Sequence, residues 1–70
     1  MAKLYYLALH EEGLKNGSFF RVYPKRKHQN VAQYMNGDFM GYREEIPTTY
    51  GDQPLREFTK REAERLIPNA

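Results

Sequence analysis

Residues that could support catalysis or metal binding are few and scattered along the chain. The two histidines, His10 and His28, lie in separate predicted connectors, and the single serine, Ser18, lacks a nucleophile-elbow setting. His10-Glu11-Glu12 offers potential ligands, but three adjacent residues on a turn rarely converge on one metal ion. The chain has no cysteine, which excludes thiolate ligands and disulfides. We therefore expect no enzymatic activity, no metal and no cofactor.

Aromatic residues are the more unusual feature. The 70 residues include six Tyr and four Phe but no Trp, and aromatic residues with Arg are enriched at protein–protein interfaces. Lys25-Arg26-Lys27-His28 concentrates cations in one predicted loop, yet the net charge is only +2. That balance is too mild to indicate nucleic acid by itself.

The length predicts a single domain over residues 1–70, with a thin core. Apolar patterning predicts an α+β fold in which one C-terminal helix packs on one face of an antiparallel sheet. The sheet is expected to have three to four strands. The predicted strands cover residues 3–9, 18–24, 30–35 and 39–44, and the predicted helix covers residues 60–67.

The first predicted strand is apolar on both alternating faces, which is typical of a central strand covered on both sides. In the second, Phe20 and Val22 face one way, and Phe19, Arg21 and Tyr23 face the other. Pro24 ends this strand, so the basic cluster at 25–28 is expected to be a loop.

Asn36-Gly37 is a strong signal for a type I′ hairpin, because both of its central residues need φ > 0. The predicted register pairs Met35 with Asp38, Tyr34 with Phe39, Gln33 with Met40 and Val31 with Tyr42. The alternative is a short helix over 29–35 that ends at Asn36-Gly37.

Two segments show no clear element. His10 to Gly17 is interpreted as a connector because Gly13 and Asn16-Gly17 are breakers. Residues 45–57 form a long loop that is either functional or extends the core by placing Ile46, Tyr50 and Leu55 under the helix.

The helix is best specified at its start. Thr59 and Glu62 form a T-x-x-E capping box, and Phe58 is placed to fold back near Ala63. Lys60 and Arg61 oppose the macrodipole in the first turn. A partner contact would explain that placement, as would pairing of Arg61 with Glu64 and of Arg65 with Glu62.

A narrow helix can cover only one side of a sheet that carries apolar residues on both sides. We therefore expect a non-enzymatic protein-binding module that acts through an aromatic sheet face. The expected contact residues are Tyr5, Phe19, Arg21, Tyr23, Tyr34 and Tyr42. One alternative is a nucleic-acid-binding domain, and another is a small homodimeric accessory protein. The residues expected to contact phosphates are Arg21, Lys25, Arg26, Lys27, Arg43, Lys60 and Arg61.

The helix opening Phe58-Thr59-Lys60, with Glu62 and Ala63, resembles the AP2-like arm-binding domains of tyrosine recombinases, and Phe19 to Tyr23 resembles one of their strands. This resemblance implies a three-stranded sheet packed on a C-terminal helix, with the free sheet face in the DNA major groove. Here aromatic and Met residues occupy the hairpin where those domains carry Arg and Lys.

In size and composition the chain also resembles short phage and prophage proteins, which implies an inhibitor or adaptor of a host protein. No apolar run reaches the length of a signal peptide or membrane span, so we expect a cytoplasmic protein without a membrane partner.

Overall fold

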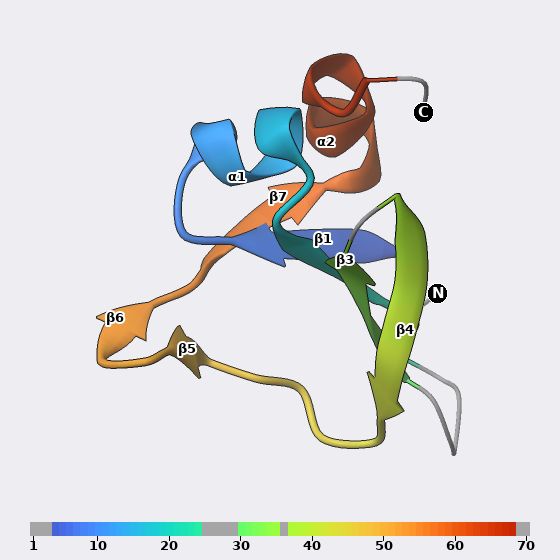
Figure 1. Ribbon diagram of the computed structural model, residues 1–70, viewed down its shortest axis with the longest axis vertical. Coiled ribbons are helices and arrows are strands. Elements are labelled where there is room, and N and C mark those ends of the chain that lie inside the picture. The colour runs from blue at the N-terminus through green and yellow to red at the C-terminus, as the bar shows by residue number, and fades with distance from the viewer. Residues whose placement is uncertain (1–3, 25–29, 36, 69–70) are drawn as a thin grey trace.

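The computed structural model describes residues 4–24, 30–35 and 37–68, and it shows an α+β fold (Figure 1). Two short helices lie on one side of an antiparallel sheet, and a small two-stranded hairpin lies on the other side. In chain order the elements are β1 (Tyr5–Ala8), α1 (Glu11–Asn16), β2 (Phe19–Val22), β3 (Val31–Met35), β4 (Asp38–Arg43), β5 (Thr49–Tyr50), β6 (Gln53–Pro54), β7 (Arg56–Thr59) and α2 (Lys60–Leu66).

The main sheet has five strands in the order β4-β3-β2-β1-β7, so the prediction of three to four strands was too low. The additional strand, β7, begins inside the segment that was interpreted as a loop. It forms an edge and pairs antiparallel with β1. Phe58 is its one buried residue, so it shows none of the apolar alternation that reveals a strand. The central position of β1 is confirmed, since β2 and β7 flank it.

The hairpin formed by β3 and β4 confirms most of the predicted register. Met35 pairs with Asp38, Tyr34 with Phe39 and Gln33 with Met40. The strand at 31–35 also rules out the alternative helix at those residues, whereas Asn36 lies outside the described residues. Val31 pairs with Arg43 instead of Tyr42, because a β-bulge shifts the register between Val31 and Gln33.

Gly41 lies in this bulge, because β4 has two residues between Met40 and Arg43 where β3 has only one between Gln33 and Val31, and its φ is +64°. A glycine in the left-handed region is the usual way to accommodate one extra residue in a β-ladder. The shift turns Arg43 to the face that Tyr42 was expected to occupy.

Residues 11–16 form helix α1, so the interpretation of this segment as a connector was wrong. Its single apolar residue, Leu14, is fully buried and attaches the helix to the core. Gly17 ends the helix in the left-handed conformation, with φ of 81°. The Asn-Gly pair at this position therefore ends a helix. Glycine suits a helix C-terminus as well as it suits a turn, because both need a left-handed residue.

Helix α2 begins with the predicted capping box. The Thr59 backbone N–H donates to Glu62 Oε1 at 3.0 Å, and the Glu62 N–H donates to Thr59 Oγ1 at 3.1 Å. Phe58 and Ala63 are both buried in one cluster. The ion pair found on this helix joins Lys60 and Glu64 at 3.8 Å, whereas neither pair expected from Arg61 and Arg65 is present among the described residues.

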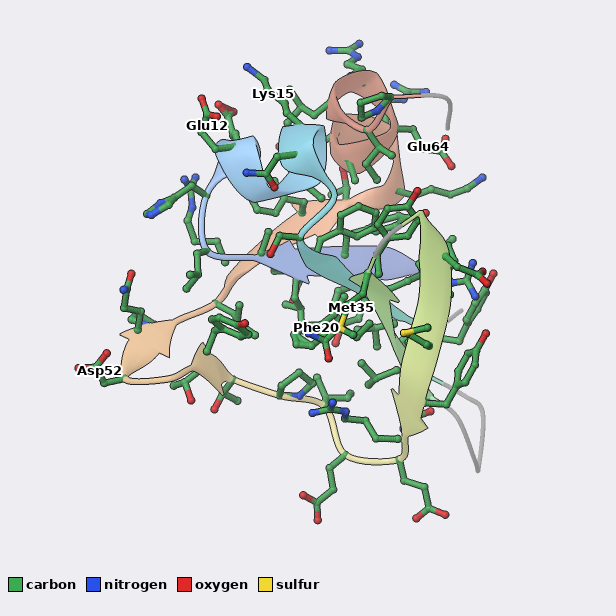
Figure 2. The ribbon with its side chains drawn as sticks, in the orientation of Figure 1. Glu12, Lys15, Phe20, Met35, Asp52 and Glu64 are labelled. Atoms are coloured by element: carbon green, nitrogen blue, oxygen red, sulfur yellow. The ribbon has the colours of Figure 1, made fainter. Side chains whose placement is uncertain are left out.

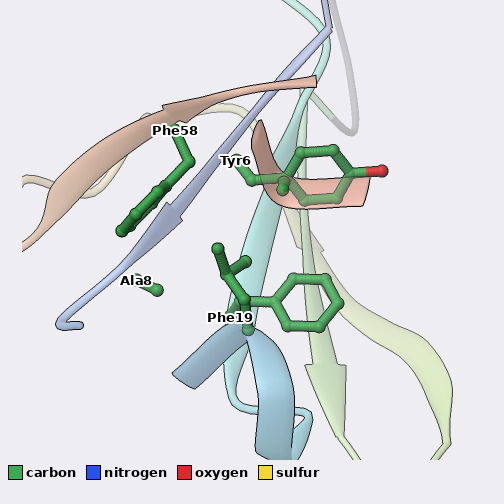
Figure 3. Packing of buried hydrophobic residues seen from close by; sticks show 6 residues of the cluster. Tyr6, Ala8, Phe19 and Phe58 are labelled. Atoms are coloured by element: carbon green, nitrogen blue, oxygen red, sulfur yellow. The ribbon is translucent and has the colours of Figure 1, made fainter. Parts of the chain in front are cut away.

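The sheet separates two apolar clusters. On the helix face, which we define as the face that α1 and α2 cover, the buried residues are Tyr6, Ala8, Leu14, Phe19, Phe58 and Ala63 (Figure 3). On the opposite face, which we call the pocket face, they are Leu7, Phe20, Val22 and Val31.

One interpretation of the sequence placed Leu55 under α2. In the structure Leu55 packs on the pocket face instead. Ile46 and Tyr50, from the same segment, remain 41% and 53% exposed. The long segment therefore covers the pocket face only in part.

Candidate binding surfaces

The structure divides the predicted contact residues among three environments. Arg21, Tyr23, Tyr34 and Tyr42 lie on the helix face, on or beside the strands β2 to β4. Tyr5 lies on the pocket face, where it packs partly buried beside the Val22 cluster. Phe19 lies in the core. The six residues therefore do not form one continuous surface.

Phe19 is only 3% exposed, so its assignment as a contact residue was wrong. Its ring stacks on Tyr34 with 4.7 Å between centroids and meets Tyr6 and Phe39 edge-on at 5.6 and 6.1 Å. The alternation placed Phe19 and Arg21 on the same face correctly. It could not show that the helices cover that face at Phe19.

Arg21 lies beside this ring cluster on β2, the middle strand of the sheet, where it pairs with Tyr6 of β1. Its guanidinium carbon is 3.8 Å from the centroid of the Phe39 ring and 5.1 Å from that of Tyr23. A guanidinium over an aromatic face is attracted by the ring quadrupole, with about 0.5–2 kcal/mol depending on desolvation. The two rings therefore hold the flat cation on the sheet surface.

One atom of this guanidinium is unsatisfied. Arg21 Nε is buried and has no hydrogen-bond partner, and leaving a buried donor unpaired costs about 1–3 kcal/mol. Nearby, burial raises the pKa of the Tyr6 hydroxyl, Glu64 raises it further, and Arg21 acts in the opposite direction. Arg21 and Glu64 thus both lie close enough to Tyr6 to influence its charge.

The pocket face contains a pocket of about 170 Å³. Leu7 and Phe20 contribute from the sheet, and Tyr50 and Leu55 contribute from the β5–β6 segment. An apolar cavity of about 150 Å³ accommodates benzene. The pocket is therefore large enough for one aromatic or branched aliphatic side chain.

Polar groups line the other end of this pocket, where β1 leads into α1. They include His10, Glu12 and Ser18. Within the described residues, no hydrogen bond joins the side chains of these three. These side chains provide hydrogen-bond donors and acceptors at one end of the pocket.

Exposed apolar side chains continue the pocket face. Pairing in the sheet places Met40 on the same face as Gln33 and Phe20, and alternation adds Met35. Figure 2 shows Phe20 and Met35 on the side of the sheet away from the helices. Met35 and Met40 are 38% and 40% exposed.

Sequence reasoning did not select these methionines as contact residues. The predicted hairpin register pairs Met40 with Gln33. Pairing Gln33 with Phe20 in addition would have placed both methionines on the same face as Phe20.

The cations expected to contact nucleic acid are distributed over different surfaces. Arg21 lies on the helix face, whereas Arg43 lies on the pocket face with its guanidinium carbon 5.5 Å from the Phe20 ring centroid. Lys60 and Arg61 lie in the first turn of α2. Lys25, Arg26 and Lys27 lie outside the described residues.

No protein-family model matches this chain, and no significant match is found among curated proteins or solved structures. Over the part of the chain that the structure describes, no cluster of three or more His, Asp or Glu side chains could hold a metal ion. None of the helices in that part is long and apolar enough to cross a membrane.

Proposed function

We propose that this chain is a non-enzymatic protein-binding module, an inhibitor or adaptor, whose main contact surface is the pocket face. The observation that supports this most is the pocket between the sheet and the β5–β6 segment, which exposed Tyr50 lines, with exposed Met35 and Met40 on the same face of the sheet. A partner inserts one apolar side chain between Phe20 and Leu55.

The physical reason lies in the unequal covering of the two faces. Helices close the helix face over β1 and β7, whereas a segment with only two two-residue strands lies over the pocket face. Ile46, in that segment, and Met40, on β4, remain 41% and 40% exposed. Apolar groups gathered around a pocket are typical of protein-binding sites, and methionine adapts well to varied partner surfaces.

The test is affinity capture with matched variants, each first shown to be folded by circular dichroism. Tyr50→Ala and Met35→Lys alter the pocket face, and Tyr42→Ala removes a comparably exposed aromatic ring from the helix face. We expect one protein that the wild type and Tyr42→Ala retain but the two pocket-face variants lose. Retention by all three variants, or loss only with Tyr42→Ala, would contradict the proposal.

The same samples test the other two hypotheses. A mass that increases with concentration in light scattering, with no other protein captured, would identify a homodimer. Retardation of nucleic acid in a gel shift, weakening steeply with salt, would favour the nucleic-acid hypothesis, because phosphate contacts release counterions.

A further inference from the structure

Arg21 lies over two aromatic rings on the helix face, away from the surface to which the proposed function is assigned. The residue belongs to β2, and its guanidinium lies 3.8 Å from the centroid of Phe39 on β4 and 5.1 Å from that of Tyr23. Phe39 itself packs edge-on against Tyr34, with 5.0 Å between centroids. The cation is therefore held by rings that the sheet fixes in place.

Two nitrogens of the guanidinium remain available. Nε is its one buried and unpaired nitrogen. Neither terminal nitrogen donates a hydrogen bond to a described residue. The terminal nitrogens therefore reach solvent. Over residues 4–24, 30–35 and 37–68, no carboxylate forms an ion pair with Arg21.

We propose that Arg21 binds an acidic side chain of a protein partner. The two terminal guanidinium nitrogens donate hydrogen bonds to the carboxylate of that side chain. The planar fork of arginine matches a carboxylate in a bidentate geometry. Stacking on Phe39 fixes the orientation of the fork before binding, so less conformational freedom is lost when the carboxylate arrives.

A carboxylate fits this site better than a phosphate because, among the described residues, Arg21 is the one cation placed over the Phe39 and Tyr23 rings. Arg43 lies on the other face of the sheet, and Arg56 is placed over Phe58, with 5.3 Å from its guanidinium carbon to the ring centroid. Lys60 pairs with Glu64, whose charge acts on the adjacent Tyr6. A dianion beside Glu64 would be poorly compensated, whereas one negative charge is matched by Arg21.

This inference goes beyond the proposed function, since Arg21 lies on the helix face and needs no side chain in the pocket. It is tested with the whole chain, uniformly labelled with ¹⁵N. The probes are the peptide acetyl-Leu-Glu-Glu-Leu-amide, its twin with two glutamines in place of the glutamates, and inorganic phosphate. Because Nε is buried, its N–H exchanges slowly and reports on the site directly.

We expect the glutamate peptide to shift the Arg21 Nε–H resonance and the glutamine peptide to leave it unchanged. Arg21→Lys should weaken binding of the glutamate peptide roughly tenfold or more, because lysine keeps the charge but loses the bidentate fork. Arg43→Lys, the matched control, should change the affinity by less than about twofold.

Three results would overturn the inference. The first is an Arg21 resonance that does not move at millimolar glutamate peptide, and the second is equal binding of the glutamine twin. The third is tighter binding of phosphate than of the glutamate peptide, which would identify a phosphate site. If Arg21→Lys does not fold, the titrations of the wild-type protein decide the question alone.

Discussion

Replacing Phe19 with alanine should lower the unfolding free energy of this protein strongly, because Phe19 lies at the centre of a ring cluster. It is 3% exposed, and the rings around it come from β1, β3 and β4. These rings are anchored in three strands and cannot easily close the space. Buried Phe→Ala substitutions cost about 3–5 kcal/mol of unfolding free energy.

That loss is large for a chain of this length. At about 0.05–0.15 kcal/mol per residue, a domain of this size has roughly 3.5–10 kcal/mol in total. Each kcal/mol shifts the melting temperature of a small domain by about 4–8 °C. The Phe19→Ala variant should therefore melt roughly 12–40 °C below the wild type, or fail to fold.

Urea denaturation followed by circular dichroism measures this difference directly. Tyr50→Ala is the control, because that ring is 53% exposed and its loss should change the unfolding free energy by no more than about 0.5 kcal/mol. A Phe19→Ala variant that lost less than about 1 kcal/mol would refute the core assignment and return Phe19 to the set of contact residues.

Three smaller perturbations test the helix ends. Thr59→Ala removes the capping hydroxyl and should lower the unfolding free energy by about 1 kcal/mol in urea denaturation; an unchanged value would mean that the capping box is not formed in solution. The Thr59 backbone N–H lowers the pKa of Glu62 below its usual value of 4.5. Stability from this contact is therefore present above pH 4.5 and is lost as the pH falls through the lower, folded pKa. Unfolding free energy measured between neutral pH and pH 2 should show that loss in the wild type but not in Glu62→Gln, and identical acid profiles would contradict it. Gly17→Ala forces alanine to φ of +81° with its Cβ 3.2 Å from Tyr34 Cε2, so we expect a loss of about 1–2 kcal/mol, and a thermal midpoint equal to that of the wild type would show that the C-terminus of α1 relaxes.

Local signals in the sequence were sufficient for β2, for three of the four predicted β3–β4 pairs and for the start of α2. Asn36-Gly37 fixed three of the four predicted pairs, and Thr59 with Glu62 fixed the helix cap. Each of these features depends on residues that are close in the chain. The prediction therefore needed no knowledge of tertiary packing.

The missed features depend on distant contacts. Helix α1 has a single buried side chain, Leu14, and β7 has only Phe58, so neither shows a periodic pattern. The bulge at Gly41 on β4 shifted the pairing by one residue and moved Arg43 to the pocket face. The sequence also could not show which face the helices cover, because both faces of the central strands are apolar.

The most direct test of the pocket-face proposal is site-specific photocrosslinking. Benzoylphenylalanine replaces Tyr50 in one sample and Tyr42 in another, and both are irradiated in the same cell lysate. The proposal predicts one protein crosslinked at position 50 and absent at position 42, with Met35→Lys abolishing the crosslink. Crosslinking of that protein only from position 42, or insensitivity to Met35→Lys, would contradict it.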